Sequence, residues 1–338
     1  MTDPRVRAAR RAALDHLLGL IAALPWSDGL VLRGSMLMCA WAAGSARDPA
    51  DLDFVVLPDL SVPIDPFDPL PHVAVLDAVQ QWPEAADGAA RYEIWKDGDE
   101  EFHTGGIHAI AAPEGLNWAE EPDRSELTVD YHHDLVRQLR LQPQAAADVL
   151  LAPDRVRTDD SWTYAYGGDG PGGIRIIVPW SAPDLPGGEV HIDLAMDERL
   201  PEAPVWALIP RAGAAAPLVV RAASRGLSLA WKLHWLRADS TGSTGPRPKD
   251  LYDAVILAED GRTRLSARLL KTILGRSDAT IAATTREFGI SGPEQADWEA
   301  FTEDNPGISG TAHDWRLRLD TALARLPSPW QSAQHTVS

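Results

Sequence analysis

The sequence predicts an α/β (α+β) fold, in which a lobe of mixed or antiparallel sheet with helices precedes a helical C-terminal lobe. Short apolar runs bounded by Gly and Pro, which are typical of strands, dominate the N-terminal part. From Ala222 onward, apolar residues recur at helical spacing instead. We therefore divide the chain into an α/β domain, residues 1–215 with an elaboration at 61–160, and a helical domain, residues 216–338.

The N-terminal elements follow one another closely. Apolar residues at helical spacing predict a helix over residues 4–24, which Pro25 ends. A strand, a tight turn, a helix and a second strand are then expected at 30–32, Gly34-Ser35, 36–43 and 52–57.

The middle of the chain predicts fewer regular elements. Helices are expected near 73–82 and over 132–140, with a charged segment, 97–101, between them. Three strand-like runs then predict an antiparallel meander at 161–166, 173–180 and 189–196. The C-terminal helical segments include SLAWKLHWLRAD, KDLYDAVILAED and DWRLRLDTALARL.

Composition limits the function classes. No apolar run approaches the roughly 18 residues that cross a bilayer, so we expect a cytoplasmic protein with no membrane partner. The single cysteine, Cys39, lies in an apolar stretch and is expected to be a small buried side chain. The net charge of −18 argues against non-specific coating of nucleic acid, and no DNA partner is expected.

Three aspartates lie in predicted strands or directly before one. Asp51 and Asp53 are two positions apart and therefore point to the same side, and Asp193 lies on the polar face of EVHIDLAM. Adjacent carboxylates repel one another unless a cation relieves them, and divalent metals prefer oxygen ligands. The alternatives are that Asp51 only caps a turn and that Asp193 faces solvent on an edge strand.

The Gly34-Ser35 pair precedes a predicted helix. A glycine turn at a helix N-terminus offers backbone N–H groups and a positive dipole end to a phosphate. The alternative is a turn without ligand. Together with the Asp-Leu-Asp strand, the pair predicts a site for a metal and a phosphate group.

The order Gly34-Ser35, Asp51-Leu52-Asp53, then Asp193 resembles the nucleotidyltransferase superfamily of DNA polymerase beta. More narrowly, RGSMLMCAWAAGSARDPADLDFVV and LAWKLHWLRADSTGSTGPRPKDLYDAVILAE resemble the AbiEii/AbiGii toxin family of nucleotidyltransferases, which includes the MenT toxins. The resemblance implies a nucleotidyltransferase fold and an NTP substrate. It also implies Mg²⁺ held by Asp51 and Asp53, with Asp193 either completing the metal site or taking a proton from the attacking hydroxyl.

The same resemblance assigns roles to further residues. Gly34 and Ser35 would cradle the nucleotide phosphates, and Arg47 matches an arginine common in the family before the Asp-x-Asp strand. Lys232 would contact the triphosphate, and Asp250 would be the acidic position of the last motif. A tRNA 3′ end as acceptor and a cognate antitoxin as partner are also implied.

Alternatives remain open from the residues alone. Lys232, surrounded by apolar residues, either extends its ammonium to solvent or meets an anion. The chain could be a catalytically weak nucleotide-binding or interaction protein, or a transferase acting on a small molecule or a protein. A metal-dependent hydrolase is disfavoured, because the histidines are scattered along the sequence.

Overall fold

The computed structural model describes residues 3–57, 94–97, 100–103, 117–118, 130–159, 172–196, 198, 200–213, 215–242, 245–274 and 285–326. The chain splits into two compact units. The helical unit comprises Met1–Arg11, Gly34–Ala50 and Ser224–Ser338, and the sheet unit comprises Ala12–Arg33 and Asp51–Ala223. The division at residue 215 that the sequence suggests stays a prediction.

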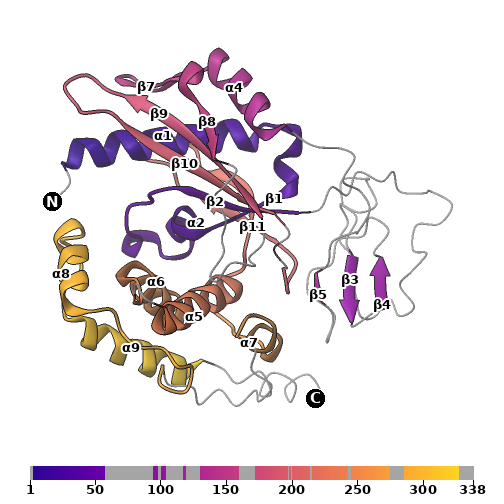
Figure 1. The fold of residues 1–338 in the computed structure, drawn as a ribbon, viewed down its shortest axis with the longest axis vertical. Coiled ribbons are helices and arrows are strands. Elements are labelled where there is room, and N and C mark those ends of the chain that lie inside the picture. Colours follow the sequence, from indigo (N-terminus) through magenta and orange to yellow (C-terminus); the bar gives the residue numbers. More distant parts are fainter. Residues whose placement is uncertain are drawn as a thin grey trace. The chain divides into compact units, whose positions relative to one another are not determined.

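The sheet unit is built on one mixed sheet (Figure 1). Within the described ranges it has nine strands in the order β11-β12-β1-β2-β10-β9-β7-β6, with β8 also paired to β9. Their bounds are β1 Leu30–Arg33, β2 Leu52–Val56, β6 Gln144–Ala146, β7 Val149–Leu151, β8 Arg157–Asp159, β9 Gly173–Ser181, β10 Gly188–Ala195, β11 Val205–Ile209 and β12 Leu218–Ala222.

The central strands of this sheet have a partner on each side and are buried. β2 runs antiparallel to β1 and parallel to β10, and β10 runs antiparallel to β9. Leu52 and Phe54 of β2 are buried, as are Ile192 and Leu194 of β10. The expected antiparallel pairing of 173–180 with 189–196 is confirmed.

Helices and a second sheet complete the sheet unit. α1 (Pro4–Ala22) begins in the helical unit and ends in the sheet unit, where Leu14, Leu17 and Leu18 are fully buried. α4 (Tyr131–Leu141) is capped by the Asp130 side chain, which accepts a hydrogen bond from the His133 N–H. Short 3-10 helices span Pro25–Gly29 and Pro153–Arg155.

The predicted charged segment 97–101 coincides with a hairpin. β3 (Ile94–Asp97) pairs antiparallel with β4 (Glu100–His103) and with β5 (Asn117–Trp118), in a sheet of its own. The helix expected near 73–82 and the strand expected at 161–166 lie outside the described residues.

The helical unit confirms the helical pattern of the C-terminal part. α6 packs against both α5 and α9, as Figure 1 also shows. Ser224 caps α5, and Thr311 with Asp314 forms a capping box at the start of α9. The helices are α2 Gly34–Trp41, α5 Arg225–Thr241, α6 Pro248–Glu259, α7 Ala267–Leu274, α8 Gln295–Asp304 and α9 Ala312–Arg325, with a 3-10 turn at Ala43–Ser45.

One close approach in this unit requires glycine. A Cβ on Gly226 of α5 would lie 2.1 Å from the carbonyl oxygen of Arg264. The absence of a side chain therefore lets the helix pack directly on the backbone of the segment before α7.

None of the helices in the described ranges has both the length and the apolar character of a membrane span.

Candidate active site

Three carboxylates meet at two neighbouring strands of the sheet unit. Asp51 directly precedes β2, Asp53 lies within it, and Asp193 lies in β10. Because β2 and β10 are parallel with Asp53 opposite Asp193, the side chains converge, and one oxygen from each residue lies within 4.8 Å of the others. The structure brings the three predicted metal ligands together, and their function stays a prediction.

Asp193 does not lie on an edge strand. β10 runs between β2 and β9, and Asp193 is only 2% exposed. The alternative of a solvent-facing aspartate is therefore wrong. Asp51 and Asp53 are half-buried, so this carboxylate cluster is partly exposed.

Two arginines flank the cluster across the sheet. The register aligns Arg33 of β1 with Asp53 of β2, Asp53 with Asp193 of β10, and Asp193 with Arg175 of β9. Directly paired residues on neighbouring strands share a face, so these four side chains form one row. Arg33 forms an ion pair with Glu198.

Arg175 is bound to Asp193 by two hydrogen bonds. Its Nε donates to Asp193 Oδ1 and its Nη2 donates to Oδ2, both at 2.7 Å. The paired oxygens match the planar fork of the guanidinium, which makes this contact specific for arginine over lysine. Sequence reasoning missed this residue, although Arg175 is the one charged residue in the strand GIRIIVPW.

Opposing effects act on Asp193. Burial raises the pKa of Asp193 above its usual value, and the nearby Asp51 adds to the rise, although the hydrogen bonds and charge of Arg175 counteract it. A carboxylate in this position is stabilised in its charged form by any additional cation.

The Gly34-Ser35 pair begins α2 in the helical unit. Gly34 has a φ of 72°, a left-handed conformation that favours glycine. Ser35 is buried, and its hydroxyl accepts a hydrogen bond from the backbone N–H of Ala50 at 3.3 Å. The same helix carries Cys39, which is buried as expected.

Lys232 belongs to a second charged group, which lies in the helical unit. Its Nζ lies 2.7 Å from Asp250 Oδ1 and 3.0 Å from Asp253 Oδ2. Arg47 donates to both oxygens of Asp253, at 3.1 and 3.0 Å. Asp250 and Asp253 share one face of α6 because they are three residues apart. We call Arg47, Lys232, Asp250 and Asp253 the ion cluster.

The ion cluster is closed to solvent. No side chain in it is more than 8% exposed. Burial lowers the pKa of Lys232, but the Asp250 and Asp253 carboxylates outweigh it and hold the pKa above its usual value. Burial raises the pKa of Asp253, but Arg47 and Lys232 outweigh it and hold the pKa below its usual value. Lys232 therefore meets carboxylates and does not reach solvent.

The predicted site residues thus form two groups. The carboxylate cluster belongs to the sheet unit, whereas Gly34, Ser35, Arg47, Lys232 and Asp250 belong to the helical unit. Asp253, which accompanies Asp250 in the motif KDLYD, emerges as the residue that joins Lys232 to Arg47.

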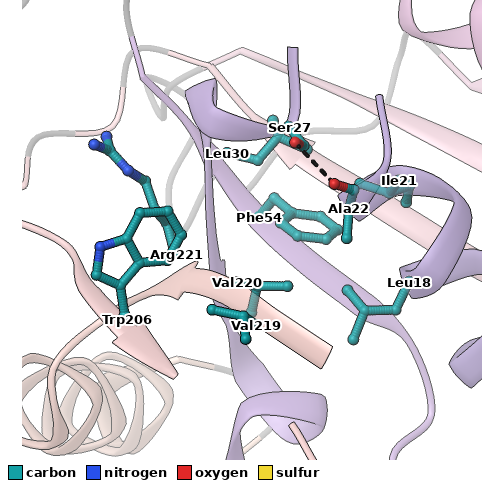
Figure 2. A pocket seen from close by; sticks show the side chains of 10 residues that line it. All are labelled: Leu18, Ile21, Ala22, Ser27, Leu30, Phe54, Trp206, Val219, Val220 and Arg221. Carbon is teal, nitrogen blue, oxygen red and sulfur yellow. Dashed lines mark hydrogen bonds between the residues drawn. The ribbon is translucent and has the colours of Figure 1, made fainter. Parts of the chain in front are cut away.

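A small cavity in the sheet unit is lined by none of these residues. Figure 2 shows the side chains that line it. Its volume is about 50 Å³, which suits a water molecule and not a nucleotide. Phe54 lines it, and adjacent strand residues such as Asp53 point to the opposite face. The lining is mostly apolar and consists of Leu18, Ile21, Ala22, Ser27, Leu30, Phe54, Trp206, Val219, Val220 and Arg221.

Comparison with solved structures gives a distant likeness. The chain is similar to MenT4, a nucleotidyltransferase toxin from Mycobacterium tuberculosis, with 14% identity and a TM-score of 0.37. The alignment covers 95% of this chain and 94% of that one. No curated protein matches the sequence.

A family model matches more than half of the chain. The model describes the nucleotidyl transferase AbiEii toxin of type IV toxin–antitoxin (TA) systems, and it matches residues 127–325. The matched range contains Asp193, Lys232 and Asp250, whereas Asp51 and Asp53 precede it. The resemblance inferred from the sequence is confirmed: the chain belongs to the AbiEii family of nucleotidyltransferase toxins.

Proposed function

We propose that this protein transfers a nucleoside monophosphate from an NTP to an acceptor hydroxyl in a Mg²⁺-dependent reaction. A new bond forms between the acceptor oxygen and the α-phosphorus, the bond from that phosphorus to the bridging oxygen breaks, and pyrophosphate leaves. The observation that carries the proposal is the convergence of Asp51, Asp53 and Asp193 in a chain of this family.

The donor set of the carboxylate cluster fits Mg²⁺. All three residues offer oxygen ligands, which hard divalent cations prefer, and none offers nitrogen or sulfur. Asp51, Asp53 and Asp193 would hold the ion. When bound, Mg²⁺ would supply positive charge that offsets the charge of the triphosphate and of the departing pyrophosphate.

Asp193 has a second proposed role beside metal binding. As a carboxylate it can accept a hydrogen bond from the acceptor hydroxyl, orient that oxygen toward the α-phosphate and take up its proton. Its backbone is fixed by pairing on both sides, with Asp53 of β2 and Arg175 of β9. This pairing fixes the position of the Asp193 backbone relative to Asp53.

The triphosphate is proposed to be bound by groups of the helical unit. Gly34 and Ser35 begin α2, where backbone N–H groups and the helix dipole favour phosphate. Asp250 holds the Lys232 ammonium in place. Because Lys232 and Arg47 are buried with carboxylate partners, their positive charge would act on the triphosphate without direct contact. These roles rest on the family resemblance and on the local geometry of each residue.

The acceptor is proposed to be the 3′ end of a tRNA, and the biological role that of a toxin held in check by a cognate antitoxin in the cytoplasm. Membership of a toxin family supports the role and the partner. The net charge of −18 makes broad RNA coating unfavourable, so the RNA would be recognised at a local site. Small-molecule and protein acceptors are the alternatives that the experiment must separate.

The experiment is a transfer assay with each α-³²P-labelled NTP, Mg²⁺ and total cellular RNA. Wild type is compared with D51A and D53A, and a reaction without RNA measures background. We expect label in a tRNA-sized band, with one preferred NTP, for wild type alone.

Other outcomes revise specific parts of the proposal. Pyrophosphate release without labelled RNA would reject the tRNA acceptor and favour a protein or a small molecule. NTP binding without pyrophosphate release under any condition, unchanged in D51A, would reject the transferase and favour a nucleotide-binding protein.

A further inference from the structure

We propose that Arg175 is a resident positive charge that weakens divalent-cation binding to the carboxylate cluster. A bound cation and the Arg175 guanidinium would then both interact with the Asp193 carboxylate. The inference rests on the proposed metal site, and it concerns the affinity of that site for a divalent cation.

The contact between Arg175 and Asp193 occupies both carboxylate oxygens. Nε and Nη2 each donate at 2.7 Å, within the range of charge-assisted hydrogen bonds. One of the same oxygens lies within 4.8 Å of oxygens from Asp51 and Asp53. Any cation that is bound by all three residues therefore takes an oxygen that already accepts a hydrogen bond from Arg175.

Arg175 and Arg33, the two arginines that flank the carboxylate cluster, have different ion-pair partners. Arg33 forms an ion pair with Glu198, which lies outside the carboxylate cluster. Arg175 instead forms its bidentate ion pair with Asp193, which is a member of the cluster. The charge of Arg175 thus acts directly on a proposed metal ligand.

Replacing Arg175 with a neutral residue has two opposing effects. Repulsion between the guanidinium and an incoming dication disappears, which tightens binding. Asp193 also loses a partner that orients it, which weakens binding.

The first effect is expected to dominate. The β10 backbone remains fixed between β2 and β9, so that only the short Asp193 side chain gains freedom. The loss of a full charge at hydrogen-bond distance from a buried ligand is worth about a tenfold change in affinity.

The chain offers a matched control for the loss of an arginine from this sheet. Arg157 of β8 also pairs with β9 and makes a bidentate contact, to Glu189, at 2.9 and 2.8 Å. Both partners are exposed, at 52% and 39%, and neither belongs to the carboxylate cluster. R157Q therefore removes the same chemical group without changing the proposed metal site.

The test is a Mn²⁺ titration of the full chain, with free Mn²⁺ followed by electron paramagnetic resonance. We expect R175Q and R175M to bind Mn²⁺ about tenfold more tightly than wild type. R175K loses the bidentate contact but keeps the positive charge, so its affinity should stay within about twofold of wild type. The affinity of R157Q should be unchanged. Two neutral variants are used so that one folded protein, checked by circular dichroism, is available.

Equal or weaker binding by the folded neutral variants would overturn the inference, because orientation of Asp193 would then outweigh charge. Tighter binding by R175K as well as R175Q would also overturn it. D53N separates the two proposals: if wild type binds Mn²⁺ no better than D53N, the proposed metal site itself fails, and the role of Arg175 fails with it.

Discussion

The carboxylate cluster and the ion cluster use the same residue types with different charge balance. In the ion cluster, Arg47 and Lys232 face Asp250 and Asp253, so that two positive groups meet two negative groups away from solvent. The carboxylate cluster gathers three aspartates, of which Asp193 is paired with Arg175. Removing one partner from a balanced, closed group destabilises a fold, whereas three neighbouring carboxylates, two of them half-buried, can bind a further cation.

The largest effect is expected from neutralising the carboxylate cluster. D53N should lower the rate of pyrophosphate release by about 10³-fold, because a proposed metal ligand is lost. The unfolding midpoint should change by only a few degrees, because Asp53 is half-buried and asparagine keeps the shape of its side chain. Initial rates and thermal unfolding of the same preparation check both parts. A D53N protein with normal activity would remove this cluster from the reaction.

Removing one charge from the ion cluster should instead lower the stability of the fold. D253N leaves Arg47 and Lys232 buried with weaker partners, and we expect the free energy of unfolding to fall by about 3–5 kcal/mol. Urea unfolding followed by circular dichroism measures the change. A loss below about 1 kcal/mol would show that the ion cluster contributes little to stability.

The pH dependence of stability sharpens the same contrast. The pKa of Asp253 is lowered from 3.8 in the folded protein, so its contribution is present above pH 3.8 and is lost as the pH falls below that value. The pKa of Lys232 is raised from 10.5, so its contribution is complete below pH 10.5 and is lost as the pH rises above it.

Unfolding of wild type and D253N across pH 3–11 tests this directly. The difference in the free energy of unfolding between wild type and D253N should be largest near neutral pH. It should become smaller toward pH 3, where Asp253 becomes protonated in the unfolded chain. A difference that is constant with pH would mean that the stability change arises from packing and not from charge.

The smallest effect is expected from an exposed pair with similar geometry. Arg318 makes two hydrogen bonds to Glu259, at 3.0 and 2.7 Å, and both side chains are about 40% exposed. E259Q should change the free energy of unfolding by about 0.5 kcal/mol or less, because solvent already stabilises both charges. Urea unfolding of E259Q and D253N in parallel compares the exposed Arg318–Glu259 pair with the buried ion cluster. A loss as large as that of D253N would show that burial is not the cause.

Much of the local structure around the carboxylate cluster could be predicted from the sequence. Alternating apolar residues identified the strands that carry Asp53 and Asp193, and Gly and Pro marked their ends. Their side-by-side position could not be predicted in the same way. It depends on a parallel pairing between β2 and β10, which are far apart in the chain, and sequence patterns do not specify such a register.

The partners of the charged residues were harder to predict. The pairing of Arg175 with Asp193 follows from the register of the β9–β10 hairpin, which the length and shape of its connecting loop determine. In the ion cluster, helical spacing alone indicates that Asp250 and Asp253 share a face of α6. It does not indicate that Lys232 and Arg47 meet them, because those contacts join separate segments of the helical unit.

The central claim is that Asp51, Asp53 and Asp193 together hold a divalent cation. The most direct measurement is an anomalous difference map from crystals of the full chain grown with Mn²⁺ and a non-hydrolysable NTP. The account predicts a peak at about 2.0–2.3 Å from carboxylate oxygens of all three aspartates. Well-ordered carboxylates without a peak, or a peak elsewhere that is bound by none of the three, would contradict it.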